Sequence, residues 1–243
     1  MSARRTWRPA TLQDRWTESP SACTLVLEVD GWPDHLAGQH VDVRLTAPDG
    51  YQAARSYSLA APADGDLLQI TVQRTAGGEV SPFLADDLQV GDAVEVRGPL
   101  GGWFVWRPED PAPVLLVAGG SGVVPLMAMV RARAGVSRAP FRLVYSVRSP
   151  GDRLYATELR RRAAEDGGLD VAYVYTRSAP GNDPRAPGRL RADDLVGQGW
   201  PPDFEPTCFV CGPTGFVEAA SGFLVALGHD PSRVRTERFG SGS

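Results

Sequence analysis

The chain is short of cysteine, and this shortage limits its redox chemistry. Its 243 residues include three cysteines, Cys23, Cys208 and Cys211. An iron–sulfur cluster usually takes four thiolates, so the count argues against a cluster held within the chain. Cys208 and Cys211 have CxxC spacing, but the thioredoxin-type motif opens a helix and Cys208 falls inside a predicted strand. We therefore do not expect a redox disulfide.

The chain also has no long apolar run and no block of basic residues. The longest apolar runs, such as residues 114–118, are far shorter than the roughly 20 residues that cross a bilayer. The first residues carry charge with no apolar segment behind them, unlike a secretory signal. The net charge is −4 and the pI is 5.4, which argues against a nucleic-acid partner. We expect a cytoplasmic protein without a membrane span.

What is present indicates two folded domains. Apolar residues make up 42% of the chain and charged residues 22%, as in soluble proteins with a buried core. The length exceeds one average domain of about 100–150 residues. The proline-rich stretch at residues 107–113 predicts a linker. We therefore predict one domain at residues 1–108 and a second at residues 109–243.

The first half has the alternation of half-buried strands. Val41, Val43 and Leu45 alternate with polar residues, as do the valines at 94 and 96. Strands are predicted at residues 22–29, 41–45, 55–60, 67–74 and 94–97. About six strands at this spacing favour a small antiparallel six-stranded β-barrel. A short helix is expected at residues 81–88, with Ser81 as its N-cap and Pro82 at its first position.

The second half changes to buried strands that alternate with helices. Strands are predicted at residues 114–118, 141–146, 171–176 and 208–210, and helices at residues 125–134, 154–165 and 214–227. This alternation is typical of a parallel α/β sheet. The segment 178–188, rich in Pro, Gly, Asn and Asp, is expected to be a loop. The predicted fold is thus an α+β two-domain protein.

Two motifs in the predicted barrel suit a phosphate-bearing ring. In Arg55-Ser56-Tyr57-Ser58, strand geometry places Arg55 and Tyr57 on one side and the two serines on the other. A guanidinium suits bidentate phosphate contact. The glycines at residues 77–78 precede the short helix, whose free N–H groups favour phosphate oxygens. Taken singly, each motif is better explained as ordinary surface structure.

A glycine-rich turn opens the second domain. Residues 119–125, Gly-Gly-Ser-Gly-Val-Val-Pro, follow a buried strand and start a helix, which is where dinucleotide turns bind pyrophosphate. Pro125 stands where the usual motif has a helix-packing glycine, and we expect it at the first helical position. A glycine turn without a ligand is the competing interpretation.

Several arginines follow the strands of the second domain. Arg148 and Arg177 come after two predicted strands, at the sheet edge where α/β proteins bind ligands. Arg185, Arg189 and Arg191 lie in the next loop region. Neither strand ends with the acidic residue that often binds the ribose of NAD. The arginines match a 2′-phosphate instead, which favours NADPH over NADH, although some of the five are expected to be solvated surface residues.

The order of five motifs resembles the ferredoxin–NADP reductase superfamily. These are residues 55–58, 77–81 and 119–125, the Cys-Gly-Pro sequence at 211–213, and Glu-Arg-Phe at 237–239. The resemblance covers nearly the whole chain. It implies a flavin-binding barrel at residues 1–108 and an NAD(P)-binding domain at residues 109–243. It also implies an NAD(P)H-dependent flavoprotein reductase.

The resemblance assigns roles to residues of the barrel. Arg55 and Ser81, with the Val80 backbone, would hold the flavin phosphate. Tyr57 would pack on the flavin, and Ser58 would form a hydrogen bond near flavin N5. The other cofactor-binding residues expected in this domain are Ser56, Thr71, Val72 and Gly78.

In the second domain the resemblance implies a nicotinamide site. Cys211 would border the nicotinamide, Glu237 would support it, and Phe239 would cover the flavin face. With Ser58, the first two are the expected catalytic residues; a buried structural thiol is the alternative for Cys211. Plant-type members end at the aromatic residue, whereas four residues follow Phe239 here. The expected nucleotide-binding residues are Gly120, Ser121, Gly122, Arg148, Arg177, Gly212 and Pro213, and Phe239 is the cofactor-binding residue expected at the flavin. No metal site is expected.

The resemblance further implies FAD, with FMN as second choice, and NADPH as the hydride donor. The electrons would pass to an external acceptor such as ferredoxin, flavodoxin or an oxygenase component. Two alternatives stay open. One is a reductase of free flavin, and the other is a flavin- or nucleotide-binding subunit of a larger oxygenase or oxidase complex.

Overall fold

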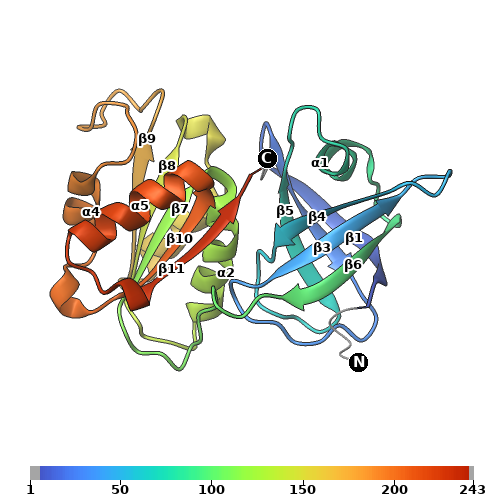
Figure 1. Cartoon of the computed structure of the whole chain (residues 1–243), viewed down its shortest axis with the longest axis horizontal. Coiled ribbons are helices and arrows are strands. Elements are labelled where there is room, and N and C mark those ends of the chain that lie inside the picture. Colours follow the sequence, from blue (N-terminus) through green and yellow to red (C-terminus); the bar gives the residue numbers. More distant parts are fainter. Residues whose placement is uncertain (1–5, 241–243) are drawn as a thin grey trace. The chain divides into compact units, whose positions relative to one another are not determined.

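A computed structural model describes residues 6–240 of the chain. The last three residues of the Gly-Ser-Gly-Ser tail lie outside this range. The chain divides into two compact units, one of Met1–Arg107 with Met127–Ala132, the other of Pro108–Leu126 with Arg133–Ser243. Each unit contains its own sheet (Figure 1). In the described range no helix is both long and apolar enough to span a bilayer.

The first unit contains a six-stranded antiparallel sheet with the order β4-β3-β6-β1-β2-β5. Its strands are β1 (Arg8–Ser19), β2 (Ala22–Glu28), β3 (His40–Thr46), β4 (Gln52–Ser58), β5 (Leu67–Gln73) and β6 (Ala93–Leu100). A bridge between Leu59 and Ile70 ties the end of β4 to β5. The Ala60 N–H also donates to Gln69 O at 2.8 Å. These contacts close the sheet into the predicted barrel.

Alternation explains most of these strands, and its weakness explains the one that was missed. Val41 and Val43 of β3 are fully buried in the barrel core. In β1, Ala10 and Leu12 are buried while most of the remaining strand is polar and at least partly exposed. One solvated face is normal in an antiparallel sheet. Too few apolar residues therefore remained in β1 for the pattern to be recognised.

The helix of the barrel starts earlier than expected. It consists of a helical turn, α1 (Val80–Pro82), continued by a π-helical turn (Phe83–Asp87). Glu79 is its N-cap, so the prediction of Ser81 as N-cap and Pro82 as first residue was wrong. Val80 is 1% exposed in the barrel core, which draws the helix start to that residue. The Ser81 hydroxyl instead accepts a hydrogen bond from Thr75 N.

The second unit contains a five-stranded parallel sheet with the order β11-β10-β7-β8-β9. Its strands are β7 (Val114–Gly119), β8 (Phe141–Val147), β9 (Leu169–Tyr175), β10 (Thr207–Pro213) and β11 (Val234–Phe239). Its helices are α3 (Ala156–Glu165), α4 (Ala192–Gln198) and α5 (Thr214–Ala226), while α2 (Val123–Arg133) is divided, with Met127–Ala132 grouped with the first unit. Helix α5 contacts β7, β10 and β11 and is flanked by α4 (Figure 1). The parallel α/β prediction is thus confirmed.

Three features of the second unit differ from expectation. Strand β11 and helix α4 were not predicted, because β11 is only partly buried and α4 is only seven residues long. Helix α2 starts at Val123, directly after a 3₁₀ turn (Gly120–Gly122), so Pro125 is its third residue rather than its first. A proline fits there because the first N–H groups of a helix have no partner within the helix.

Candidate functional site

Strand β4 presents the first expected group of site residues. Arg55 is exposed, and its guanidinium donates to the Ala54 carbonyl at 2.7 Å. Tyr57 packs against the barrel core, and burial raises the pKa of its phenol to about 12. The phenol therefore stays protonated at neutral pH. Ser58 is half-buried at the end of the strand.

Ser56 lies on the opposite face and already has a partner. Its hydroxyl donates to Asp42 at 2.6 Å. Arg97 donates to the same carboxylate, also at 2.6 Å. Burial opposes ionisation of Asp42, but the bonds from Ser56 and Arg97 lower its pKa below the ordinary value. The Ser56 side chain therefore belongs to a polar network on the barrel surface, away from the face of Tyr57.

The glycine turn before α1 lies close to β4, since α1 and β4 are in contact. Gly77 has a φ of 74°, which favours glycine. The Gly78 N–H donates to Thr75 O at 3.0 Å. The Ser81 hydroxyl accepts from the Thr75 N–H at the same distance. Ser81 thus fixes the turn and keeps only its own proton to donate to a ligand.

The other expected barrel residues have side chains that are buried or already hydrogen-bonded. Val72 and Val80 are buried in the core. The Thr71 hydroxyl shares a hydrogen bond of 2.7 Å with the hydroxyl of Thr24. These side chains are therefore occupied within the barrel, which leaves their backbone atoms as the candidates for contact with a cofactor. Arg55, Tyr57, Ser58 and the turn at Gly78 are the better candidates for direct contact.

The glycine turn of the second unit is packed against the end of β10. A Cβ added at Gly122 would lie 2.1 Å from Cys211 O, so no side chain fits. A Cβ at Gly119 would lie 2.7 Å from the Phe216 ring, and one at Gly212 would lie 2.8 Å from it. The structure thus brings together the glycine turn and the Cys-Gly-Pro sequence, two motifs far apart in the chain. Phe216, which sequence reasoning missed, contacts both.

Gly120 has the geometry of an open ligand turn. Its φ is 56°, and a Cβ there would meet nothing within 4 Å. Ser121 is half-buried beside it. Helix α2 follows directly, so its first N–H groups lie at the turn. A pyrophosphate can approach such a backbone closely and gain from the helix dipole.

Strand β11 places Glu237 opposite Cys211 in the parallel register. Cys211 is 1% exposed, and burial with the nearby Glu237 carboxylate raises the pKa of its thiol well above the ordinary value. Burial raises the pKa of Glu237 from 4.5 to about 7. The pair thus offers a protonated thiol and a carboxyl group that gains or loses its proton near neutrality. Gly212 faces Arg238, and exposed Pro213 faces Phe239 in the same register.

Arg148 and Arg177 lie next to each other at the carboxyl ends of β8 and β9. The Arg177 N–H donates to Arg148 O at 2.9 Å, and the Ser178 N–H donates to it at 3.1 Å. Both arginines are exposed. The main chain therefore holds two solvent-facing guanidinium groups at one sheet edge, where an anionic ligand can reach them.

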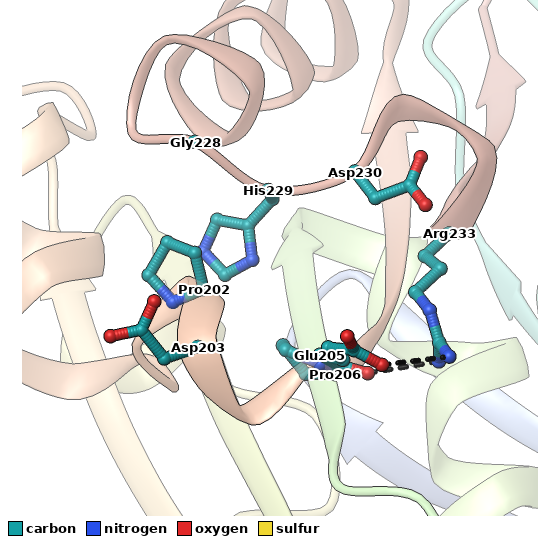
Figure 2. Close-up of a pocket in the computed structure, with 8 residues that line it drawn as sticks. All are labelled: Pro202, Asp203, Glu205, Pro206, Gly228, His229, Asp230 and Arg233. Atoms are coloured by element: carbon teal, nitrogen blue, oxygen red, sulfur yellow. Dashed lines mark hydrogen bonds and ion pairs between the residues drawn. The ribbon is translucent and has the colours of Figure 1, made fainter.

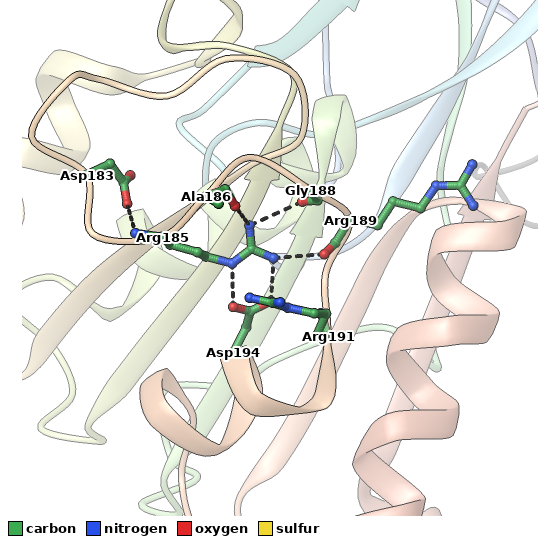
Figure 3. Close-up of polar contacts among 7 residues, drawn as sticks. All are labelled: Asp183, Arg185, Ala186, Gly188, Arg189, Arg191 and Asp194. Atoms are coloured by element: carbon green, nitrogen blue, oxygen red, sulfur yellow. Dashed lines mark hydrogen bonds and ion pairs between the residues drawn. The ribbon is translucent and has the colours of Figure 1, made fainter.

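Arg185 has a structural role instead (Figure 3). Its guanidinium binds both carboxylate oxygens of Asp194, at 2.5 and 2.8 Å, and donates to carbonyls of the same loop. Burial opposes ionisation of Asp194, but the Arg185 bond lowers its pKa. The Arg191 N–H donates to Asp194 as well, at 2.8 Å. Arg185 is therefore not free for a phosphate, while the side chain of Arg189 points away from this cluster (Figure 3).

A polar cavity of about 510 Å³ lies at the other end of the second unit, before β10 (Figure 2). Its lining residues are Pro202, Asp203, Glu205, Pro206, Gly228, His229, Asp230 and Arg233. None of them was predicted as a site residue. His229 lies 3.9 Å from Cys208 Sγ, and burial raises the pKa of that thiol to about 12.

All three cysteines are free and buried, and the described residues contain no group of three or more His, Cys, Asp or Glu suited to a metal ion.

Two family models match the chain. The oxidoreductase FAD-binding domain matches residues 9–105, and the oxidoreductase NAD-binding domain matches residues 116–222. The first coincides with the barrel and the second with most of the parallel sheet. The matched domains bind FAD and a pyridine nucleotide.

The chain is also similar in sequence to known proteins over most of its length. A flavohemoprotein of Chromobacterium violaceum is 32% identical over 97% of this chain and 61% of its own length. The glycine betaine monooxygenase reductase subunit of Pseudomonas aeruginosa is 34% identical over 84% of this chain and 56% of its own length. The chain therefore spans little more than half of these relatives.

A solved structure extends the similarity to the whole fold. The flavohem-like FAD/NAD-binding domain of nitric oxide dioxygenase from Vibrio cholerae has a TM-score of 0.86 and 26% identity. The match covers 96% of this chain and 99% of that domain. The two family models and this structure assign both units of the molecule. The chain belongs to the ferredoxin–NADP reductase superfamily of FAD- and NAD-binding oxidoreductases.

Proposed function

We propose that the protein is a flavoprotein reductase that takes a hydride from NADPH into bound FAD and delivers the electrons to an external acceptor. The observation that carries the proposal is the packing of Gly122 against Cys211 O, which leaves no room for a Cβ. This packing brings a turn suited to pyrophosphate next to the cysteine that is expected beside the nicotinamide. A dinucleotide has both groups, so one ligand accounts for the pair.

The barrel, residues 1–108 in our assignment, would hold the FAD. Arg55 is the exposed cation for its phosphate, and the turn at Gly78 offers main-chain contact nearby. Tyr57 supplies a partly buried aromatic surface, and Ser58 the hydroxyl at the end of the same strand. When bound, flavin accepts a hydride and can release electrons singly.

Residues 109–243 would bind the nucleotide, and their chemistry is positioning rather than covalent catalysis. The raised pKa of Cys211 keeps it a thiol, so it shapes the site without acting as a nucleophile. Glu237, with a pKa of about 7, is partly protonated next to it at neutral pH. Arg148 and Arg177 present two cations at one sheet edge. That arrangement favours the 2′-phosphate of NADPH over the hydroxyl of NADH.

The acceptor is proposed from a relative. The glycine betaine monooxygenase reductase subunit serves a monooxygenase by its name. An oxygenase component is therefore the first acceptor to test, with ferredoxin and flavodoxin next.

The test begins with the purified protein. Mass spectrometry of the released cofactor identifies FAD or FMN, and dye reduction with NADPH and with NADH measures activity and preference. We expect bound FAD and NADPH-driven dye reduction. Flavin that is lost on gel filtration but reduced when added back would identify a free-flavin reductase. Bound flavin without any dye reduction would identify a binding subunit of a larger complex.

A further inference from the structure

The strand order of the second unit reverses between β7 and β10. Strands β8 and β9 follow on one side of β7, and β10 and β11 lie on its other side. In open α/β sheets a ligand binds at such a reversal, beyond the carboxyl ends of the two strands. The paired register of β7 and β10 ends at Ala118 and Cys211. The next residues, Gly119 and Gly212, therefore lie where a ligand is expected.

One face of β7 and β10 carries two rows of buried side chains, which form a core cluster with side chains of α5. The members of the rows are Leu115, Val117, Cys208 and Val210. Because side chains alternate across a strand, Gly119 and Gly212 are the next positions in these rows. Each row thus ends in a residue that has no side chain.

The ring of Phe216 takes the space that both glycines leave. A Cβ at Gly119 would lie 2.7 Å from Phe216 Cδ1, and a Cβ at Gly212 would lie 2.8 Å from the same atom. Phe216 is half-buried in the first turn of α5 and packs against the core cluster. One side chain therefore touches the ends of both strands.

The two glycines are not joined to each other by strand pairing. Gly119 pairs with Ser146 of β8, and Gly212 pairs with Arg238 of β11. Both pairs lie on the outer sides of the two strands. The approach of Gly122 to Cys211 O joins the two segments beyond the strand ends. The Phe216 ring joins them on the face of α5.

Glycine main chain depends on what packs against it, because no Cβ restricts its dihedral angles. Gly119 leads directly into Gly120, the open position of the turn, and Gly212 follows Cys211. Without the ring a cavity would remain between α5 and both strand ends, and the surrounding chain would fill it only in part. The geometry of both motifs therefore depends on Phe216.

We propose that Phe216 is a positioning residue of the nucleotide site: its ring fixes the separation between the glycine turn and the Cys-Gly-Pro sequence, and with it the affinity for the nicotinamide coenzyme. This inference rests on the proposed function, since it takes these two motifs as the place where the coenzyme binds. Phe216 acts through the main chain of Gly119 and Gly212.

The first test removes the ring from the flavin-loaded full chain. Phe216→Ala should raise the Kd of the coenzyme, NADP⁺ or NAD⁺, about fivefold, because binding must then order two segments that the ring had fixed. Phe223→Ala is the matched control. Phe223 lies about two turns further along α5 and packs against the same core cluster. It should lose comparable stability and keep the Kd within about twofold of the wild type.

Titration calorimetry measures the Kd, and denaturant unfolding measures the stability. If Phe216→Ala binds the coenzyme no more weakly than Phe223→Ala, the positioning role is wrong. Phe216→Leu keeps most of the apolar volume and should bind more tightly than Phe216→Ala but more weakly than Phe223→Leu. If Phe216→Ala does not fold, the comparison of the two leucine variants decides in the same way.

The second test adds a methyl group on the other side of the contact. Gly119→Ala alone should raise the Kd at least about tenfold, because its Cβ would meet the Phe216 ring. In the double variant with Phe216→Ala the Cβ has room, so the Kd should be no higher than in Phe216→Ala alone. Effects that simply add would contradict a ring seated on Gly119.

The same titrations separate this inference from the proposed function. A wild type that binds neither NADP⁺ nor NAD⁺ would refute both. A wild type that binds the coenzyme and reduces its flavin, with an unchanged Kd in Phe216→Ala, would refute the inference alone. Flavin content should be equal in all variants, since Phe216 belongs to the second unit and the flavin is assigned to the first.

Discussion

The two units offer a ligand different parts of the chain. On the barrel, most of the candidate ligand groups are side chains of β4, with exposed Arg55 as their cation. In the parallel α/β unit, the candidate site is built on main chain, where Gly122 and Cys211 O are too close for a Cβ. A side-chain site loses one contact when one residue is changed. A main-chain site can lose its whole geometry when a single methyl group is added.

The largest expected effect is therefore a methyl group at Gly122. In Gly122→Ala the new Cβ would lie 2.1 Å from Cys211 O, and that atom belongs to a strand that cannot move aside. We expect a loss of at least about 3 kcal/mol in the free energy of unfolding. Binding of NADPH should be lost in any protein that still folds. Denaturant unfolding and nucleotide titration measure both.

Gly222→Ala is the matched control. Gly222 lies within α5, and a Cβ there meets nothing within 4 Å. Alanine is the better helix former, so stability should rise by up to about 1 kcal/mol with unchanged nucleotide binding. Equal behaviour of the two variants would show that the tight approach at Gly122 is not a constraint on the site.

The second effect is a pH dependence of stability from Glu237. Its pKa is about 7 in the folded protein against an ordinary value of 4.5, so the folded state binds the proton more tightly. The stabilisation that comes from this bound proton is fully present below pH 4.5 and is lost as the pH rises through about 7. The shift corresponds to about 3 kcal/mol. Glu237→Gln should abolish this component, as seen in unfolding free energies from pH 4 to 8.

Because other groups also titrate, the informative quantity is the difference between wild type and Glu237→Gln at each pH. Relative to Glu237→Gln, the wild type should become less stable as the pH rises, and the difference should be constant above pH 8. A difference that does not vary with pH would mean that the carboxyl group is solvated in the folded protein.

The third effect concerns nucleotide choice. Arg177→Ala removes one of two exposed cations next to each other at the sheet edge. We expect KM for NADPH to rise about 10-fold or more, as for loss of one charge-assisted bond to phosphate, and KM for NADH to stay unchanged. Arg148→Ala should act in the same direction. If both coenzymes weaken equally, these arginines do not read the 2′-phosphate.

The two units also differ in how well the sequence predicts their strands. The parallel sheet was predicted strand by strand at β7, β8 and β9, since their apolar runs are nearly continuous. The barrel was predicted from alternation, which failed at β1, where buried residues are few. Strand β11 was missed for the same reason, although Glu237 and Phe239 on it were identified from the family motif.

Contacts between distant segments could not be predicted. Nothing local indicates that Phe216 lies against both Gly119 and Gly212, or that Glu237 faces Cys211. Nor does the sequence separate Arg185, which is tied to Asp194, from the exposed Arg148 and Arg177. Residue types and motif order predict which groups are available. Which of them are already bound to a neighbour is decided by the tertiary fold.

The smallest expected effect distinguishes Ser58 from Ser56, two residues before it on β4. Ser56 donates to Asp42 on the barrel surface, while Ser58 lies at the strand end assigned to the flavin. Ser58→Ala should slow flavin reduction by NADPH about fivefold with little loss of flavin, because a positioned hydroxyl is removed but the phosphate contacts remain. Ser56→Ala should leave the rate unchanged and lower stability by up to about 1 kcal/mol, the usual effect of one lost hydrogen bond. Stopped-flow reduction and denaturant unfolding of both variants measure the four quantities. A slower rate in Ser56→Ala, or an unchanged one in Ser58→Ala, would contradict the assignment of Ser58, rather than Ser56, to the flavin.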